Sequence, residues 1–436
     1  MSLVSRSIRG YRSLMTQTEL TINSLGHRGD GIVHSETGPI FVPGALPGET
    51  FTAVLDGTRA KNVQITKASE NRIAPVCRHI NTCGGCSVQH LAAPAYLAWK
   101  RELAIKALAD RGIEHDVEAV LPCTPGSRRR AVFSATRAGR HTLLGYHEKA
   151  SNRLVDISEC PVLDPSITKA LPDLKKLAGG LLPSKGELRL TVLATTAGLD
   201  VAFEKADKSY EKKIADLSVQ AAQADLARLT VNGETLLEIR PPLLDMGGSA
   251  LTPPPGGFVQ ATKDAEEALS AWVLKGVGKA KQVADLFAGS GTFALRLARQ
   301  AKVHAVEGEA PALKAIDTAL RRSQGLKTLT MEKRDLFRSP LIAEELKDYD
   351  AVVFDPPRAG AQAQAEQLAN STVKTVVAVS CNPATFARDL RILIDGGYEL
   401  QSVTPVDQFL YSRHIEVVGI LTRKADDGAG KPSWRL

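Results

Sequence analysis

The sequence has no run of about 18 or more apolar residues, so no segment of it is long enough to cross a membrane as a helix. It also lacks the apolar stretch near the N-terminus that directs secretion. Cysteine is scarce, with six in 436 residues, and a chain of this length without a secretion signal is not expected to be a disulfide-stapled secreted protein. We therefore expect a cytoplasmic protein with no membrane partner.

The N-terminal segment Met1–Thr16 contains arginines and several serines but no acidic residue. This composition resembles that of an organelle transit peptide. We favour a disordered tail over residues 1–17, or a start codon assigned too far upstream, because Met15 could itself begin the protein.

The chain is longer than one ordinary hydrophobic core requires, and we expect two or three domains. Hydrophobic residues make up 43% and charged residues 24%, which is typical of a soluble globular protein. The net charge of +7 and the isoelectric point near 9.0 favour a polyanionic partner such as nucleic acid. No pattern indicates an obligate protein partner, so we expect a monomer.

Three of the cysteines, Cys77, Cys83 and Cys86, fall within ten residues and have the spacing of metal ligands. Two glycines between the last two allow the backbone to wrap closely around a bound centre. Of the candidates for a fourth thiolate, Cys160 is better, because a proline follows it as in many iron–sulfur ligand sets, and Cys123 is the alternative. From spacing alone, structural zinc and an iron–sulfur cluster remain equally open, and a redox-active cysteine pair is disfavoured.

Residues 18–72 have the pattern of a small β-barrel. Short alternating runs such as 51–55 and 60–65 are separated by glycine and proline turns at nearly regular spacing. Barrels of this size often bind single-stranded nucleic acid. In the following region, 73–255, a helix is expected over 94–111 and a basic run begins at Arg128-Arg129-Arg130. This run fits either a strand that follows a phosphate backbone or a solvated basic turn.

Residues 256–436 alternate regularly between helix and strand, after a boundary of prolines and glycines at 253–257. This alternation predicts an α/β domain of the Rossmann-like type, a doubly wound parallel sheet with helices on both faces. The expected helices cover 265–273, 293–301 and 312–322, and the expected strands cover 282–287, 303–306, 351–354 and 373–380.

The first turn of this domain, Ala288-Gly289-Ser290-Gly291, allows the backbone to approach a ligand, which makes Gly289 a candidate cofactor contact. Glu307 ends the second strand, 18 residues after Gly289, where it can accept hydrogen bonds from a ribose diol. The third glycine of the dinucleotide pattern is missing, since Phe293-Ala294 follows, and no pyrophosphate cradle is evident. S-adenosylmethionine, a nucleoside cofactor without phosphates, therefore fits better than NAD.

Reactive residues follow two further strands of the same domain. Cys381 comes directly after the apolar run 376–380, at the sheet edge where ligands bind, so its thiol is placed to act as a nucleophile. Asp355-Pro356-Pro357-Arg358 follows the preceding strand, and His414-Ile415-Glu416 lies downstream. A glycine loop for a cofactor, an acidic turn, a thiol and a carboxylate together indicate covalent group transfer.

These ordered motifs resemble those of the S-adenosylmethionine-dependent RNA uracil-5-methyltransferases. The similarity is to the branch with an N-terminal TRAM barrel and a [4Fe–4S] cluster, and it extends from Leu20 to Leu421. It rests on the cysteine cluster, the glycine turn, the acidic-proline turn, the final His-Ile-Glu, and the segments Gly257-Phe258-Val259-Gln260 and Ser380-Cys381-Asn382-Pro383. One departure is Leu410, where the family often has proline, in the loop before Glu416.

The resemblance implies roles for particular residues. Cys381 would be the nucleophile that adds to C6 of uracil, and Glu416 the base that removes the C5 proton. Contacts to S-adenosylmethionine would come from Gln260, Phe287, Thr292, Glu307, Asp335 and Asp355. The cluster ligands would be Cys77, Cys83, Cys86 and Cys160, which favours iron–sulfur over zinc.

We accordingly expect a TRAM-like RNA-binding barrel over 18–72, a central α+β iron–sulfur and RNA-binding domain over 73–255, and a class I methyltransferase domain over 256–436. The expected substrate is a uridine in structured RNA. The barrel and cluster favour 23S rRNA over tRNA. An RNA cytosine-5 methyltransferase is an alternative that Glu416 and the cysteine cluster argue against, and a further one is an iron–sulfur RNA-binding protein without activity.

Overall fold

The computed structural model describes residues 20–424, and the tail expected over 1–17 lies outside this range. The chain divides into two compact units. The first contains the residues up to Ala74 together with Ser87–Ala95, and the second contains Pro75–Cys86 and the residues from Tyr96 onward. Among the described residues, no helix combines the length and apolar character needed to span a membrane.

The first unit is built on one sheet. Its strands are β1 (Leu20–Thr21), β2 (Ser24–Leu25), β3 (Gly31–Ser35), β4 (Gly38–Val42), β5 (Thr50–Asp56) and β6 (Arg59–Lys67). They lie in the order β1-β5-β6-β4-β3-β2. The runs expected as strands at 51–55 and 60–65 are both strands, and they pair as the antiparallel hairpin β5–β6. Ile22, Val42 and Phe51 are buried at the centre of its small core.

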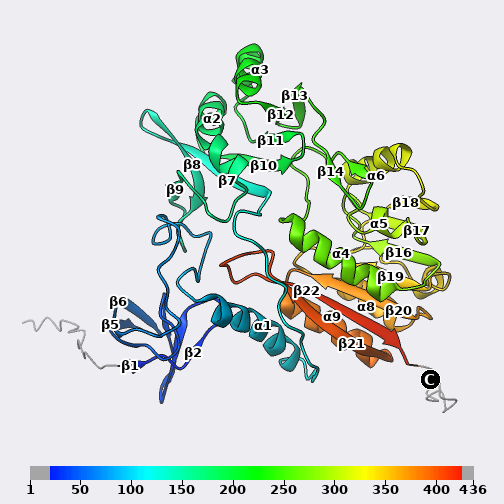
Figure 1. Cartoon of the computed structure of the whole chain (residues 1–436), viewed down its shortest axis with the longest axis horizontal. Coiled ribbons are helices and arrows are strands. Elements are labelled where there is room, and N and C mark those ends of the chain that lie inside the picture. The colour runs from blue at the N-terminus through cyan, green and yellow to red at the C-terminus, as the bar shows by residue number, and fades with distance from the viewer. Residues whose placement is uncertain (1–19, 425–436) are drawn as a thin grey trace, which may run out of the picture. The chain divides into compact units, whose positions relative to one another are not determined.

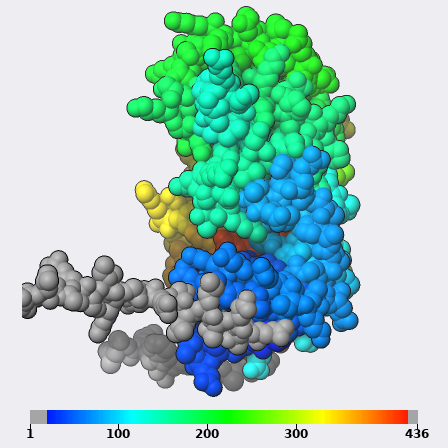
Figure 2. Space-filling view, turned by 90° about the vertical axis from the view of Figure 1, so that its left-hand side faces the viewer, coloured from blue at the N-terminus to red at the C-terminus, as the bar shows by residue number. Residues whose placement is uncertain are grey.

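The second unit contains two seven-stranded sheets, and the part that carries the first of them, residues 130–238, is called here the central lobe. Its elements are β7 (Arg130–Ala138), β8 (His141–His147), β9 (Leu154–Asp156), β10 (Leu188–Thr195), β11 (Gly198–Glu204), β12 (Leu226–Val231), β13 (Glu234–Glu238), α2 (Pro165–Leu181), α3 (Ile214–Gln223) and a 3₁₀ helix (Lys208–Lys213). Leu174 of α2 and Leu217 of α3 belong to one buried core with Phe133 and Val201 of the sheet. Figure 2 shows this lobe in space-filling form, coloured from cyan to green.

A short two-stranded sheet, β14 (Leu244–Asp245) and β15 (Ala250–Leu251), precedes the α/β domain. The strands of this domain are β16 (Gln282–Leu286), β17 (Lys302–Glu307), β18 (Leu329–Lys333), β19 (Ala351–Phe354), β20 (Thr375–Ser380), β21 (Tyr398–Val406) and β22 (Glu416–Arg423). Their order, β18-β17-β16-β19-β20-β22-β21, reverses between β16 and β19 as in doubly wound folds. The sheet extends from β18 at one edge to β21 at the other, and in Figure 1 its strand β16 is yellow-green and its strand β22 is red.

The expectation of an entirely parallel sheet is wrong for β22. This strand runs antiparallel to both neighbours, with Ser380 of β20 opposite Val417 and Val406 of β21 opposite Glu416. The physical reason is the connection: residues 407–415 are fewer than the dozen or so that a crossover between parallel strands requires, so the chain turns back on itself. As a consequence, β22 begins at the edge of the sheet where β19 and β20 end.

Helices cover both faces of this sheet. On one side are α4 (Lys263–Val277), α5 (Ala294–Leu297) and α6 (Ala310–Arg322), and on the other are α1 (Ala93–Ala109), α7 (Ala343–Leu346), α8 (Gln362–Ala369) and α9 (Pro383–Asp395). Within β19, Val353 faces the first core and Val352 the second, as the two-residue period of a strand requires. The helix expected over 293–301 is α-helical only over 294–297, because the following residues turn to enter β17 at Lys302.

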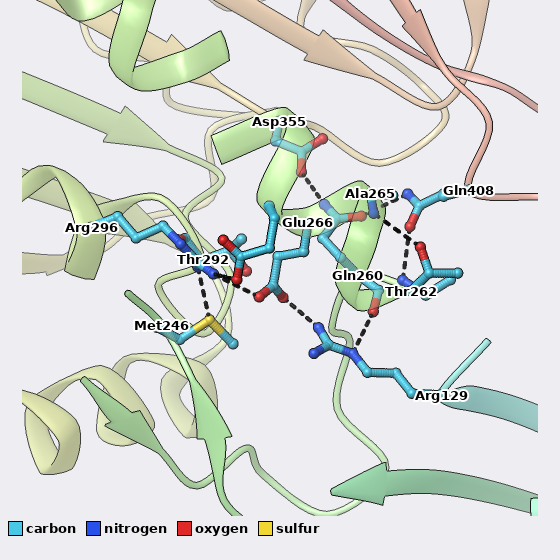
Figure 3. Close-up of polar contacts among 12 residues, drawn as sticks. Arg129, Met246, Gln260, Thr262, Ala265, Glu266, Thr292, Arg296, Asp355 and Gln408 are labelled. Carbon is cyan, nitrogen blue, oxygen red and sulfur yellow. Dashed lines mark hydrogen bonds and ion pairs between the residues drawn. The ribbon is translucent and has the colours of Figure 1, made fainter. Parts of the chain in front are cut away.

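A buried ion-pair network joins the central lobe to the α/β domain. Glu266 on α4 is fully buried, and its carboxylate bonds Arg129, just before β7, at 2.5 Å and Arg296 in α5 at 2.9 Å. Arg129 also donates from Nε to the carbonyl of Gln260 at 3.2 Å, and Arg296 donates to the carbonyl of Thr292 at 2.9 Å (Figure 3). One carboxylate thus anchors two segments that carry predicted cofactor contacts.

Two arginines of the basic run Arg128-Arg129-Arg130 bind groups of the protein itself. Arg129 is committed to Glu266, and the guanidinium of Arg130 donates to the carbonyls of Gly257 at 3.1 Å and Gly256 at 3.2 Å. The strand predicted for this run is confirmed, since Arg130 begins β7, but both arginines bind groups of the protein and are not solvated as in an exposed turn. Their charges hold the segment that leads to Gln260.

We expect Glu266→Gln to lower the free energy of unfolding by about 3–5 kcal/mol, because it leaves buried guanidinium groups without their shared carboxylate. Glu267→Gln is the matched control, since the Glu267 side chain is 51% exposed and its ion pair with Arg296 is long, at 3.4 Å. Glu267→Gln should lower the free energy of unfolding by less than about 1 kcal/mol. Urea denaturation measures both values, and equal destabilisation would contradict the role given to Glu266.

Candidate active site

Three strand ends bring the predicted nucleophile, the predicted base and one predicted cofactor contact to one edge of the α/β sheet. Asp355 follows β19, Cys381 follows β20, and Glu416 is the first residue of β22. Because Ser380 pairs with Val417 in an antiparallel register, the next positions outward along the two strands are Cys381 and Glu416. The register therefore sets the predicted nucleophile against the predicted base.

Glu416 is buried, with 2% of its surface exposed. Its Oε1 accepts a hydrogen bond from Gln408 Nε2 at 2.8 Å, whereas Oε2 has no hydrogen-bond partner among the described residues. Burial, followed by the charge of Asp355, raises the pKa of Glu416, and the bond from Gln408 opposes the rise. The raised pKa makes the ionised carboxylate a stronger base, and the unpartnered Oε2 is the oxygen that can accept a proton.

Asp355 has a similar environment. Its Oδ2 accepts a hydrogen bond from Nε2 of the buried Gln260 at 2.9 Å (Figure 3). Burial raises the pKa of Asp355, and the bond from Gln260 opposes the rise. Each of the two acids at this edge thus has one glutamine amide as its donor, and these amides partly compensate for the loss of water.

The Cys381 thiol is half-buried beside these acids. Burial, and next the charges of Glu416 and Asp355, raise the pKa of Cys381 to about 12, while Arg358 opposes the rise. The thiol is consequently protonated at neutral pH in the free protein. Since the thiolate is the nucleophile, the reactivity of Cys381 depends on the protonation state of its two acidic neighbours.

The glycine turn after β16 is held by Glu307, at the end of β17. The Glu307 carboxylate accepts the backbone N–H groups of Gly289 and Glu309, each at 2.9 Å. Gly289 has a φ of +54°, and a side chain at this position would meet no atom within 4 Å, so the turn borders open space. Each carboxylate oxygen has a second lone pair that can accept from a ribose hydroxyl, so this turn fits the nucleoside part of S-adenosylmethionine.

Aromatic residues flank the same turn. The rings of Phe287, which follows β16, and Phe337 lie 5.3 Å apart, and Phe337 is 49% exposed. Asp335, in the loop after β18, accepts the N–H of Phe337 at 3.0 Å and so helps to hold that ring. Thr292 continues the glycine turn, where Arg296 binds its carbonyl. Apart from Gln260, which precedes α4, the predicted cofactor contacts thus lie at or just after the ends of β16, β17, β18 and β19. The apolar rings offer a surface for a purine.

Two buried polar residues here received no role from the sequence. Asp285, at the end of β16, is fully buried, and neither of its carboxylate oxygens has a hydrogen-bond partner among the described residues. Burial, followed by the charge of Asp355, raises its pKa. Gln408 lies beside Glu416 with 1% of its surface exposed. Both lie close to features noted in the sequence, Asp285 three residues before Ala288 of the glycine turn and Gln408 two residues before the family departure at Leu410.

The loop between β21 and β22 is held by a buried lysine of α1. Lys100 forms an ion pair with Asp407 at 2.8 Å and donates to the carbonyls of Phe409, at 3.3 Å, and His414. The three hydrogens of its ammonium group thus have three acceptors in this loop. Leu410, where the family often has proline, lies inside the segment that Lys100 holds, so the loop has an anchor that does not depend on proline.

The predicted cluster ligands occur in segments that are pinned together in the second unit. Cys83 forms an isolated β-bridge with Glu148, just after β8. Arg78, next to Cys77, forms an ion pair with Glu159 at 2.8 Å, and Glu159 precedes Cys160.

The pKa of Cys160 shows that the predicted ligands influence one another electrostatically. Burial, with smaller contributions from Cys77 and Cys83, raises the pKa of Cys160. Cys123 is instead buried with its sulfur 3.3 Å from the hydroxyl of Thr262. Over residues 20–424, however, no three or more His, Cys, Asp or Glu side chains are grouped closely enough to hold a metal ion.

Comparison with known proteins gives a consistent result. Residues 252–425 match the family model described as tRNA (uracil-5-)-methyltransferase. The chain is 50% identical to an uncharacterized RNA methyltransferase of Agrobacterium fabrum, over 94% of this chain and 100% of that protein. It is 34% identical to the 23S rRNA (uracil(1939)-C(5))-methyltransferase of Alteromonas naphthalenivorans, over 93% of this chain and 89% of that protein.

A solved structure has a similar fold. The tRNA (uracil-54, C5)-methyltransferase of Pyrococcus abyssi, in complex with S-adenosyl-L-homocysteine, superposes with a TM-score of 0.73. The match covers 93% of this chain and 100% of that one at 22% sequence identity. At this identity the likeness concerns the fold, and it confirms the expected α/β methyltransferase architecture.

We expect Glu416→Gln to increase the rate at which iodoacetamide alkylates Cys381 at pH 8. Removing the nearby negative charge lowers the pKa of the thiol, and each unit of that shift raises the thiolate fraction about tenfold. Mass spectrometry of the Cys381 peptide against time measures the rate. Glu399→Gln, an exposed position on β21, is the control and should leave the rate unchanged. An unchanged or slower rate in Glu416→Gln would show that the two side chains do not interact.

Proposed function

The chain belongs to the family of S-adenosylmethionine-dependent RNA uracil-5-methyltransferases, and on this premise we propose that it methylates C5 of a uridine in 23S rRNA through a covalent adduct with Cys381. The observation that carries the mechanism is the register of β20 and β22, which sets Cys381 against Glu416. A thiol beside a buried carboxylate with one unpartnered oxygen is what an addition and a later proton abstraction need.

The reaction divides into three steps at the uracil ring. The thiolate of Cys381 adds to C6, and the electron pair of the C5–C6 double bond moves into the ring as an enolate. C5 then forms a bond to the methyl group of the S-adenosylmethionine sulfonium, whose methyl carbon–sulfur bond breaks with its electron pair left on sulfur, so S-adenosylhomocysteine is the leaving group. Finally Glu416 removes the C5 proton, the C5–C6 double bond forms again, and the bond from C6 to sulfur breaks to release the thiolate.

The residues around the glycine turn would hold the methyl donor. We propose that Glu307 binds the ribose diol and that the purine packs on Phe287 and Phe337. The remaining polar contacts would come from the residues near the same edge of the sheet: Gln260, Gly289, Thr292, Asp335 and Asp355. Support comes from the open space beside Gly289 and from the free lone pairs of Glu307. A cationic sulfonium bound beside this space would favour the ionised forms of Asp285 and Asp355, whose pKa values burial raises.

Several features favour 23S rRNA as the substrate. The Alteromonas naphthalenivorans relative, 34% identical over nearly the whole chain, is named for uracil methylation in that RNA. The net charge of +7 favours a polyanion, and we propose that the six-stranded sheet of the first unit acts as a TRAM-like RNA-binding barrel. A target in structured RNA must leave its stack to reach Cys381. We place this activity in the cytoplasm and assign it to a monomer.

We further propose that Cys77, Cys83, Cys86 and Cys160 hold a [4Fe–4S] cluster with a structural role. The bridge from Cys83 to Glu148 and the ion pair from Arg78 to Glu159 support this, because they tie the cysteine segment to the chain beside Cys160. Backbone N–H groups also point to the sulfurs, as they do around iron–sulfur centres. Gly85 donates to Cys83 at 3.4 Å, and hydrogen bonds from the amides of Val162 and Leu163 oppose the rise in the pKa of Cys160 that burial causes.

Protein purified without oxygen should be brown and contain about four irons per chain. Cys160→Ser should lose iron and colour, because it removes a ligand. Cys123→Ser is the control and should keep both, since that sulfur lies against Thr262. Iron analysis and the visible absorption spectrum measure the outcome. Retention of iron in Cys160→Ser with loss in Cys123→Ser would reverse the choice of the fourth ligand.

The two catalytic residues should stop the reaction at different points. Cys381→Ala should abolish methylation and form no covalent complex with undermodified 23S rRNA, because nothing adds to C6. Glu416→Gln should accumulate a complex that survives denaturing electrophoresis and carries the labelled methyl group, because the C5 proton stays in place.

Near-normal turnover by Glu416→Gln would remove this residue from the mechanism. Undermodified tRNA, tested in parallel with the wild-type protein, separates the two RNA classes. Methylation of tRNA alone would overturn the assignment to 23S rRNA while leaving the chemistry intact.

A further inference from the structure

Gln408 lies between the two acids of the active site in a position that its own hydrogen bonds define. It follows β21 by two residues and is almost completely buried. Its amide contacts three groups, the backbone of Ala261, the side chain of Gln260 and the carboxylate of Glu416. The three steps of the proposed reaction assign no role to this residue.

The backbone fixes which way the Gln408 amide points. The N–H of Ala261 donates to Gln408 Oε1 at 2.8 Å, and a backbone N–H can only donate. Oε1 must therefore face Ala261, and the two hydrogens of Nε2 must face the other side. There they meet Gln260 Oε1 at 2.7 Å and Glu416 Oε1 at 2.8 Å, so both hydrogens have an acceptor.

The orientation of the Gln408 amide also fixes the orientation of the Gln260 amide. Because Gln260 Oε1 accepts from Gln408, its Nε2 is left to donate, and it does so to Asp355 Oδ2 at 2.9 Å. In Figure 3 the side chains of Gln408 and Gln260 face each other, and Gln260 reaches toward Asp355. One backbone N–H thus sets the direction of a chain of hydrogen bonds that ends on both buried carboxylates.

Glu416 is held at one oxygen only. Gln408 occupies Oε1, while Oε2 is buried and has no hydrogen-bond partner among the described residues. A buried acceptor left unpaired costs about 1–3 kcal/mol, and such groups are rare in folded proteins outside functional sites. The arrangement leaves Oε2 oriented and available.

From this geometry we propose that Gln408 is a positioning residue, which binds Oε1 of Glu416 so that Oε2 is directed to the C5 proton of the uracil adduct. The proposal rests on the proposed function for the identity of that proton. The donated bond also favours the ionised form of Glu416, since it opposes the rise in its pKa that burial causes. Gln408 acts through Glu416 and needs no contact with the substrate itself.

The test replaces Gln408 with methionine, which has a similar volume and no donor. In Gln408→Met the carboxylate of Glu416 loses its one donor, so its pKa rises and its orientation is less defined. We expect the midpoint of the pH–rate profile for single-turnover methylation to move upward by about one pH unit. At pH values well below that midpoint, the rate should be roughly tenfold lower than in the wild type. Covalent complex should accumulate at pH 7.5 and diminish at higher pH.

A purely structural role predicts a different pattern. Lost packing would lower the rate by the same factor at every pH and trap no complex, and this result would overturn the proposal. Gln401→Met, at an exposed position of β21, is the matched control and should leave the profile unchanged. If Gln408→Met fails to fold, the isosteric Gln408→Glu should shift the profile in the same direction, because it sets a second acid beside Glu416.

A measurement without RNA separates this inference from the proposed function. At a pH between the Glu416 pKa values of the two proteins, Glu416 is ionised in the wild type and neutral in Gln408→Met. Cys381 is then more acidic in the variant, and its alkylation at pH 8 should be several-fold faster. Faster alkylation in a protein whose wild type does not methylate uridine would contradict the proposed reaction and sustain the link between Gln408 and Glu416. An unchanged alkylation rate would refute that link whatever the enzyme methylates.

Discussion

The antiparallel pairing of β22 with β20 is the constraint on which the active site depends. In a wholly parallel sheet, the first residue of the last strand would lie at the amino edge, far from the ends of β19 and β20. The short connection after β21 turns the chain back, so Glu416 begins its strand beside Cys381 and Asp355. Lys100 holds this connection through an ion pair and two carbonyl contacts, so a helix on one face of the sheet determines where the base lies.

Burial of the acidic side chains raises their pKa values and also lowers the stability of the folded protein. Asp285, Asp355 and Glu416 all have raised pKa values because they are removed from water. Burial of Cys381 itself, and next the charges of Glu416 and Asp355, keep its thiol protonated. Such groups lower the stability of a folded chain, so the segments that carry them have to be held in place by other contacts. Glu266 is the clearest case. It fixes Arg129 and Arg296, which bind the carbonyls of Gln260 and Thr292, and so links the central lobe to the cofactor residues.

Local pattern in the sequence was enough to predict part of this site. Apolar runs placed β19 and β20 correctly, and a residue that comes after a parallel strand must lie at the carboxyl edge, which located Asp355 and Cys381. The direction of β22 could not be read in this way, because a strand has the same two-residue period in either direction. Arg129 and Arg130 looked like surface charges, but their partners are remote in the sequence. Gln408 was missed for the same reason, since its role depends on contacts with Gln260 and Ala261.

The proposed mechanism is tested most directly by one measurement with RNA that carries 5-fluorouridine at the target position. Glu416 can remove a proton from C5 but cannot remove fluorine, so the wild-type protein with S-adenosylmethionine should form a stable covalent complex. Mass spectrometry of the digested complex should find a methylated fluorouracil nucleotide on the peptide that contains Cys381. Attachment to another cysteine, or the absence of any complex when ordinary RNA is methylated at C5, would contradict the mechanism.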